Sequence, residues 1–215
     1  KLLSDHQFKY LTLNAGSILD LNSKTLKLNG SGTALSVSGT MLTAGSTIEY
    51  NGTAVQNFPQ ANVNYENVKF NDTAGVVLVD NVSVTGLIEV TNGDVNLNGK
   101  IFTLLANATL SETPGNTFTG TSGYLVTTRN INAPNNLNVG GLGALITTSS
   151  NLGLTEIKRG HSVQTLPAGN LAIRRYYAIK PFNNSDLNAT LIMSYDPSEL
   201  NGLEESKLSL FKSTN

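Results

Sequence analysis

NYENVKFNDTAGVVLVDNVSVTGLIEVTNGDVNLNGKIFTL, residues 64–104, alternates apolar and polar residues in segments of three or four. Two apolar residues separated by one outward residue are typical of a short β-strand with one buried face. The pairs are Val68/Phe70, Val77/Val79, Val82/Val84, Ile88/Val90, Val95/Leu97 and Phe102/Leu104. Successive pairs begin only five to nine residues apart, which is too close for long hairpin arms. We therefore expect short strands joined by tight corners, as in a β-solenoid.

Similar pairs continue back toward the N-terminus, and several of the strands end at a corner asparagine. The earlier pairs are Leu11/Leu13, Leu19/Leu21, Leu26/Leu28, Leu35/Val37 and Ile48/Tyr50. The corner residues are Asn29, Asn51, Asn71 and Asn92, at intervals of 22, 20 and 21 residues. This interval predicts an all-β parallel coil over residues 1–130, with about five turns of roughly 21 residues and three sides per turn. Residues 54–63 break the pattern and are expected to loop out of one turn.

An antiparallel meander is the alternative, because Asn-Gly between alternating strands usually marks a two-residue hairpin turn. A meander explains each corner singly. It does not explain why the corners recur at a near-constant interval with further apolar pairs between them, so the coil is favoured.

The pattern breaks at residues 111–123, SETPGNTFTGTSG, and longer strand-like runs follow. These runs cover residues 142–149, 154–166, 171–182, 189–196 and 207–212. Such runs with turn signals between them predict an antiparallel β-sandwich-like module over residues 131–215. Between the last two runs, Asp196, Pro197 and Glu199 supply an N-cap, a first-turn proline and a capping-box glutamate, so one helical turn is expected there.

The composition excludes several partners. The 215 residues carry a formal net charge of −1, with 13% charged residues and no Cys or Trp. No basic cluster is large enough to indicate nucleic acid or anionic lipid as a partner. No apolar run approaches the roughly 20 residues that a membrane span needs, so we expect no direct membrane insertion. Because the chain begins at Lys1 without an initiator Met, it is interpreted as an excised or processed segment.

Residues 64–104 resemble the repeats of large secreted surface proteins of the Bacteroidetes, in which a right-handed parallel β-helix precedes a β-sandwich module. RGHSVQT (159–165), RRYYAIKP (174–181) and residues 187–213 are similar to the sandwich of those proteins. The resemblance implies export to the cell surface and a stalk-like or adhesive role. It also implies a sandwich that is incomplete at the C-terminus of this chain, and it implies no catalytic residues.

Candidate catalytic and metal-binding chemistry is sparse. Polysaccharide lyases and glycosidases built on β-helices need clustered carboxylates in one groove. The repeat brings only Asp72 and Asp94 to neighbouring corners, and two solvated turn residues are the favoured interpretation. His6 and His161 lie in different segments and supply too few ligands for a zinc site. We predict no catalytic residues, no metal site and no cofactor.

Arg174, Arg175, Tyr176 and Tyr177 are the candidate ligand contacts, because basic and aromatic residues interleave only there. In a strand, one Arg/Tyr pair packs inside the sandwich and the other lies on its surface, where it is available to a surface polysaccharide or another cell-surface protein. An Arg stacked on a neighbouring Tyr is the commoner explanation. Thr73, within Asp72-Thr73-Ala74, resembles the O-glycosylation site of secreted Bacteroidetes proteins.

Lys27, Glu49, Lys69 and Glu89 each lie between the two apolar members of a corner strand. They must point outward if the apolar members point inward. With one repeat per turn they stack in a single column of alternating charge. A slip of one turn would place like charges together, so the column is expected to help specify the register of the strands.

The first hypothesis for function is a non-enzymatic segment of an exported cell-surface protein that acts as a stalk, spacer or adhesin. The alternative is a carbohydrate-active β-helix, a polysaccharide lyase or glycosidase, or its polysaccharide-binding part. A second alternative is an ice-binding face built from ladders of Thr and Asn. Three or more convergent carboxylates would favour the enzyme, and a flat column of regularly spaced Thr would favour ice binding.

Overall fold

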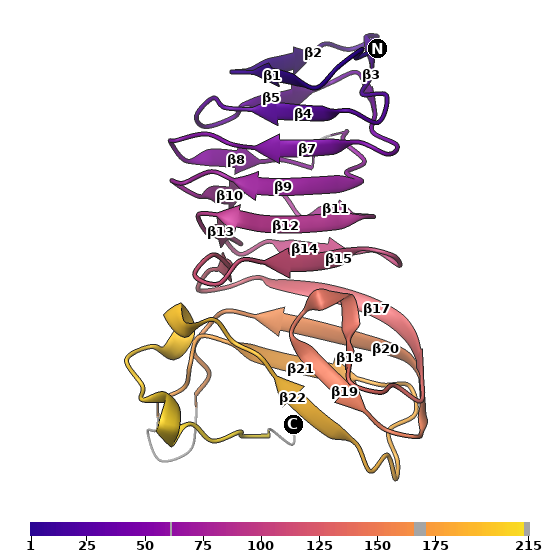
Figure 1. Cartoon of the computed structure of the whole chain (residues 1–215), viewed down its shortest axis with the longest axis vertical. Coiled ribbons are helices and arrows are strands. Elements are labelled where there is room, and N and C mark those ends of the chain that lie inside the picture. Colours follow the sequence, from indigo (N-terminus) through magenta and orange to yellow (C-terminus); the bar gives the residue numbers. More distant parts are fainter. Residues whose placement is uncertain (61, 166–170, 213–215) are drawn as a thin grey trace.

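The fold was obtained as a computed structural model that describes residues 1–60, 62–165 and 171–212. Strands stack as a column that leads into a smaller antiparallel part (Figure 1). We call the column of strands from β1 (His6–Phe8) to β16 (Phe118–Thr119) the coil and the part from β18 (Leu137–Asn138) onward the module. Strand β17 (Tyr124–Asn132) joins them. Over the described residues no helix has the length and apolar content needed to span a bilayer.

The longest sheet of the coil consists of parallel strands from successive turns, as the corner spacing predicts. Its order is β1 (His6–Phe8), β4 (Thr25–Leu28), β7 (Thr47–Tyr50), β9 (Asn67–Asn71), β12 (Leu87–Asn92) and β15 (Thr109–Glu112). Ile48 pairs with Val68 in parallel register, so the antiparallel meander is wrong and the solenoid is confirmed. The sheet stacks six strands, one turn more than the five expected.

The other sides of the coil are formed by shorter parallel strands. One sheet contains β8 (Gln56–Phe58), β10 (Val76–Leu78), β13 (Val95–Asn96) and β16 (Phe118–Thr119). Another begins with β11 (Val82–Val84), β14 (Ile101–Leu104) and β17 (Tyr124–Asn132). In the first two turns the corresponding pairs are β2 (Leu11–Leu13) with β5 (Leu35–Val37), and β3 (Ile18–Asp20) with β6 (Thr40–Leu42).

Two local expectations for the coil are wrong. Val76 and Leu78 point inward, while Val79 is 36% exposed, so the prediction that Val77 and Val79 form an inward pair is wrong. In a run of four consecutive apolar residues, the sequence does not indicate which two side chains face inward.

Residues 56–58 do not loop out of the coil but form β8, with Phe58 fully buried. This strand has a polar residue, Gln56, at its other inward position, and that broke the apolar pattern.

The centre of the coil is filled by aromatic rings that contact one another across turns. The ring centroids of Phe58 and Phe70 lie 5.0 Å apart at 88°, and those of Phe102 and Phe118 lie 5.0 Å apart at 65°. Edge-to-face pairs of this kind contribute about 0.5–1.5 kcal/mol beyond the burial of their area. Tyr50 joins the same cluster through Phe58, at 5.1 Å. The coil therefore has one continuous apolar core.

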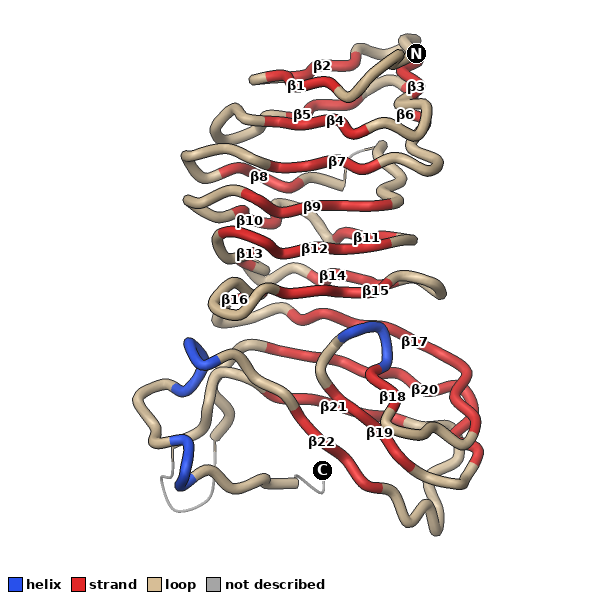
Figure 2. The backbone as a smooth tube through the Cα atoms, viewed as in Figure 1, coloured by secondary structure: helices blue, strands red, loops and turns tan. Residues whose placement is uncertain are grey.

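Strand β17 carries the sheet from the coil into the module. It pairs in parallel with β14 and antiparallel with β20 (Asn151–Gly160), which pairs antiparallel with β21 (Tyr176–Lys180). A second antiparallel sheet contains β18 (Leu137–Asn138), β19 (Ala144–Thr147) and β22 (Thr190–Met193). In the described part of the chain, short 3-10 turns are formed by η1 (Val139–Gly141), η3 (Pro197–Leu200) and η4 (Glu205–Lys207). Figure 2 shows these turns in blue, all within the module.

The expected strands of the module are found in part. Those over 142–149, 171–182 and 189–196 contain β19, β21 and β22, and the run at 154–166 falls on β20, with Leu166 outside the described residues. The strand expected at 207–212 is wrong, because residues 208–212 have no strand partner and leave Leu210 69% and Phe211 55% exposed. The turn expected at Asp196 is confirmed as η3, whose capping box is complete.

Candidate functional site at the junction of coil and module

The column Lys27, Glu49, Lys69 and Glu89 lies along the longest sheet of the coil. Each residue is the register partner of the next. Lys27 Nζ is 3.1 Å from Glu49 Oε2, and Glu49 also accepts a hydrogen bond from Asn71 Nδ2 at 2.9 Å. Glu49 is only 5% exposed because these neighbours cover it. The column is therefore a structural feature of one face rather than a binding site.

The carboxylates Asp72 and Asp94 each accept a backbone hydrogen bond at a corner of the coil. Asp72 is buried, so its interpretation as a solvated turn residue is wrong; its Oδ1 accepts from the amide of Ala74 at 2.9 Å, and burial raises its pKa. Asp94 accepts from the amide of Thr117 at 3.0 Å, and burial raises its pKa too. Thr73 is exposed at its corner. Among the residues that the structure describes, no group of three or more acidic or histidine side chains is arranged to hold a metal ion.

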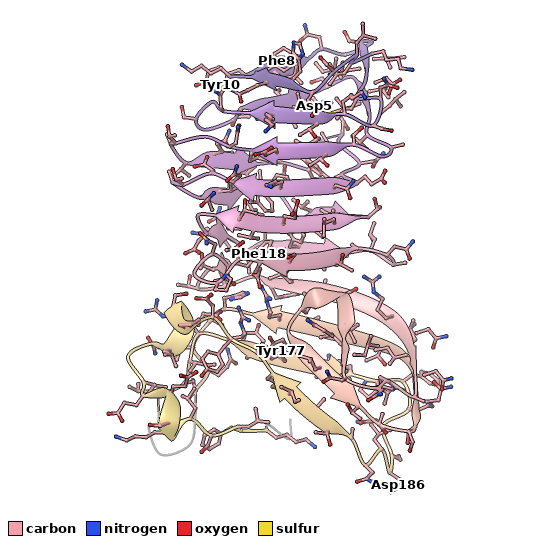
Figure 3. The ribbon with its side chains drawn as sticks, in the orientation of Figure 1. Asp5, Phe8, Tyr10, Phe118, Tyr177 and Asp186 are labelled. Carbon is pink, nitrogen blue, oxygen red and sulfur yellow. The ribbon has the colours of Figure 1, made fainter. Side chains whose placement is uncertain are left out.

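The candidate contacts at residues 174–177 point to different places. Arg175 is 9% exposed, and the hydroxyl of Tyr177 lies 2.9 Å from the carbonyl oxygen of Leu142. Arg174 is exposed, and the ring of Tyr176 covers Gly160, where even a Cβ would lie 2.1 Å from the ring. Figure 3 shows Tyr177 within the module, below Phe118 at the end of the coil. The four side chains do not form one surface.

A network of buried charges lies where the last coil turn meets the module. Arg159, on β20, is fully buried and binds Glu112, on β15, through two parallel hydrogen bonds of 2.8 and 2.6 Å. Burial alone would raise the pKa of Glu112, but the Arg159 guanidinium outweighs burial and lowers it to about 2. Glu112 also accepts from the hydroxyl of Thr117 at 2.8 Å. The pair is therefore fully charged at neutral pH.

His161 connects this pair to the C-terminal turn of the module. Arg159 Nε donates to His161 Nε2 at 3.2 Å, so the imidazole proton is on Nδ1 and is donated to Glu199 Oε1 at 2.6 Å. Burial lowers the pKa of His161 to about 4, so the ring is neutral at pH 7. Both ring nitrogens are engaged within the protein. His161 consequently has no nitrogen free to act as a general base toward a substrate.

Glu199 and Asp196 complete the network from η3. Glu199 Oε2 lies 2.7 Å from Arg175 Nε and accepts from the amide of Asp196 at 2.8 Å. Asp196 Oδ2 accepts from the amide of Gly115, in the coil, at 2.8 Å. Arg175 donates to Thr117 Oγ1, also in the coil, at 3.0 Å. The capping box predicted from the sequence thus also fastens the module to the coil.

A cleft of about 860 Å³ opens beside the network. One wall consists of residues from the coil corners that follow β13 and β16, and the other of residues from the module, including Ser162, Arg174 and Asn201. His161 and Glu199 contribute to its lining, and Asp94 lies on its coil side. Of the candidate ligand contacts, only Arg174 lines this cleft.

Comparison with protein-family models, curated proteins and solved structures gives no match for this chain.

Sequence reasoning did not identify the junction. Glu112, Arg159 and Glu199 were not recognised as a group, because they are separated by 40 or more residues and the contacts depend on how the module packs. The one available signal was the pairing of Asp196 with Glu199 in a capping box, which located the turn but not its partners.

Proposed function

We propose that this chain is a rigid, non-enzymatic segment of an exported cell-surface protein, which acts as a stalk or spacer and presents an adhesive part. The observation that carries this proposal is the junction. The sheet formed by β14, β17 and β20 continues from the coil into the module. The ion pair between Glu112 of the coil and Arg159 of β20 adds a buried contact across the junction. A hinge between two parts normally coincides with few contacts and a polar linker, whereas the described residues of this junction form a continuous sheet and a buried ion pair.

Export and surface location rest on the resemblance of residues 64–104 and of the module to secreted Bacteroidetes proteins. They are tested by surface proteolysis and antibody labelling of intact cells that produce the protein. Labelling only after lysis would contradict this part of the proposal.

Rigidity is tested by distance measurements between spin labels. The chain has no Cys, so Ser36→Cys and Ser149→Cys introduce the only two labelling sites, one in the coil and one in the module. Ser36→Cys with Ser111→Cys, both within the coil, is the matched control. We expect the distance distribution across the junction to be as narrow as that of the control. A broad or bimodal distribution across the junction would rule out a rigid spacer.

The enzyme alternative has a direct test. Polysaccharide substrates are incubated with the protein with and without calcium, and reducing ends and unsaturated products are measured. We expect no product, because the carboxylates that converge at the junction are occupied: Glu112 and Glu199 are paired with arginines, and Asp196 accepts from a coil amide. At the corners, Asp72 and Asp94 each accept from a backbone amide, and His161 is engaged on both nitrogens. Calcium-dependent product that disappears in Asp72→Ala would support the lyase instead.

The ice-binding alternative has less support. The residues in register at the start of neighbouring strands of the longest sheet form one row. Thr47 pairs with Thr25 on one neighbouring strand but with Asn67 on the other. Two turns later in the same row, Leu87 pairs with Thr109. Threonine therefore does not repeat from turn to turn along this row.

A further inference from the structure

We infer that the cleft between coil and module binds a neutral oligosaccharide. Its volume of about 860 Å³ falls within the range of roughly 300–1,000 Å³ that is usual for small-ligand sites. Polar side chains from two parts of the chain converge on it, and the network beside it fixes both walls. This inference is independent of the stalk function, because a rigid spacer does not need a ligand.

The coil wall supplies uncharged hydrogen-bonding groups. Asn96 Oδ1 accepts from the amide of Asn98 at 2.8 Å, which fixes the Asn96 side chain and leaves its NH2 group without a partner among the described residues. Asn98 is fixed in turn by donating to the carbonyl oxygen of Leu78 at 3.1 Å, which leaves its own side-chain oxygen as an acceptor. Thr121 and Ser122 add exposed hydroxyls. Amides and hydroxyls at fixed positions suit sugar hydroxyls, which both donate and accept.

The module wall supplies a braced guanidinium. Arg174 Nε donates to Asn201 Oδ1 at 3.3 Å, and its backbone amide donates to the carbonyl oxygen of Glu199 at 2.8 Å. Asn201 is itself fixed by donating to the carbonyl oxygen of Ala172 at 3.1 Å. The terminal nitrogens of Arg174 have no hydrogen-bond partner in the described part of the chain. A fork of donors with fixed geometry matches two adjacent hydroxyls of a sugar ring.

The charges of the cleft favour a neutral ligand. Arg174 and Asp94 carry opposite charges, and Glu199 is neutralised by the adjacent Arg175. The cleft therefore has no excess positive charge to attract a polyanion. Val163, 46% exposed in the module wall, offers an apolar contact for the carbon face of a sugar ring.

The cleft is poorly suited to an extended peptide. Peptides that bind in extended form usually add a strand to a free sheet edge. The coil strand nearest the cleft, β16, is only two residues long, and the amide of Phe118 already donates to Glu112 Oε1 at 3.2 Å. A carbohydrate is the ligand class that these groups can recognise without such an edge.

The test is an NMR titration of the isotopically labelled chain with neutral hexasaccharides, each raised to about 10 mM, a range that detects even millimolar binding. The probes are the hexamers of β-1,4-glucose, α-1,4-glucose, β-1,4-xylose, β-1,4-mannose and β-1,4-N-acetylglucosamine, with hexagalacturonate as the anionic comparison. We expect saturable shifts of the amides of residues 96–99 and 119–122 with at least one neutral probe.

Two variants locate the binding. Arg174→Ala should weaken the binding about tenfold, as expected for the loss of charge-assisted hydrogen bonds, and Thr121→Trp should abolish it by filling the cleft. Lys180→Ala, at the end of β21 outside the cleft, is the control and should bind as the unaltered chain does. The inference is overturned if no neutral probe shifts the cleft amides, if the shifts map elsewhere, or if hexagalacturonate binds more tightly than every neutral hexamer. Failure here leaves the spin-label distances, and thus the stalk proposal, unaffected.

Discussion

The coil and its junction with the module bury different kinds of side chain. In the coil the interior is mainly apolar, with a few buried polar residues such as Gln56, and Phe58, Phe70 and Phe102 are fully buried against one another. At the junction the fully buried side chain of Arg159 is held by Glu112. An apolar core tolerates exchange between similar turns, because hydrophobic contact is not directional. A buried ion pair requires one partner at one position, so the junction defines how the module is seated on the last turn.

The largest effect is expected from breaking the buried pair. Glu112→Ala leaves Arg159 buried without its carboxylate and should lower the free energy of unfolding by about 3–5 kcal/mol. Urea denaturation measures the change. Glu156→Ala removes the surface partner of Lys158, 3.4 Å away, and serves as the control, with an expected change of about 0–1 kcal/mol.

The double variant Glu112→Leu/Arg159→Met sharpens this comparison. Replacing both charges with apolar residues removes the unpaired charge, so we expect part of the lost stability to return. Recovery is incomplete, because His161 Nε2 loses the donor on Arg159 and the amide of Phe118 loses the acceptor on Glu112. If Glu112→Ala were as mild as Glu156→Ala, the junction would not depend on the pair.

A smaller effect is expected in the coil core. Leu78 is fully buried and Val79 is 36% exposed on the same strand run. Leu78→Ala should lower the free energy of unfolding by about 2–4 kcal/mol through the lost burial and the cavity left behind. Val79→Ala, as the matched control, should change it by about 0.5 kcal/mol or less. Equal effects of the two substitutions would mean that the opposite face of this strand points inward.

Sequence reasoning predicted the coil because its signal is local and repeated. Val68 and Phe70 occur in one strand of one turn, and Ile88 and Val90 occur in the same way one turn later. Each copy reinforces the interpretation of the others. Which side chains of residues 76–79 face the core was not predictable, since all four residues are apolar. Strand β8 was missed because its inward Gln56 is satisfied by Leu28 and Gly52, which only the folded structure brings close.

The junction was beyond sequence reasoning for a different reason. Glu112 and Arg159 are 47 residues apart, and neither belongs to a repeat. Nothing in the local pattern distinguishes a buried arginine from an exposed one. The strand wrongly expected at 207–212 also depends on tertiary structure. The alternation of apolar and polar residues there is typical of a strand, but it does not indicate whether a neighbouring strand is present to pair with it.

Acidification should weaken the junction before it affects the coil. The pKa of His161 is lowered from 6.5 to about 4 by burial, so below pH 6.5 the unfolded chain takes up a proton that the folded chain does not. Stability therefore falls as the pH drops from about 6.5 toward 4, by about 2 kcal/mol at pH 5. Glu112, whose pKa is about 2 in the folded chain, adds a loss in the same direction only below about pH 4.5.

Urea denaturation between pH 7 and 5 measures this loss, and His161→Gln is the comparison. Glutamine keeps a donor and an acceptor but does not titrate, so the variant should lose the pH-dependent part between 6.5 and 5. Asp72 and Asp94, whose pKa values are raised by burial, act in the opposite direction in both proteins and cancel in the difference. The same slope in the variant and the parent chain would show that His161 does not titrate as described.

The smallest effect concerns the charge column on the coil, where the comparison with the junction is most direct. Lys27 and Glu49 form an ion pair of 3.1 Å, but the side chain of Lys27 is 39% exposed, whereas that of Arg159 is fully buried. A double-mutant cycle with Lys27→Ala and Glu49→Ala should give a coupling energy of about 1 kcal/mol or less, because the Lys27 ammonium is exposed to water although Glu49 is covered. Glu49→Ala alone should cost more than Lys27→Ala alone, since Asn71 then loses the acceptor of its 2.9 Å hydrogen bond. Added salt at about 1 M should reduce the coupling further, as it does for exposed charges, while leaving the effect of Glu112→Ala nearly unchanged. A coupling of about 3 kcal/mol that persists in salt would mean that the column stabilises the coil as the buried pair stabilises the junction, and the distinction between the two regions would not hold.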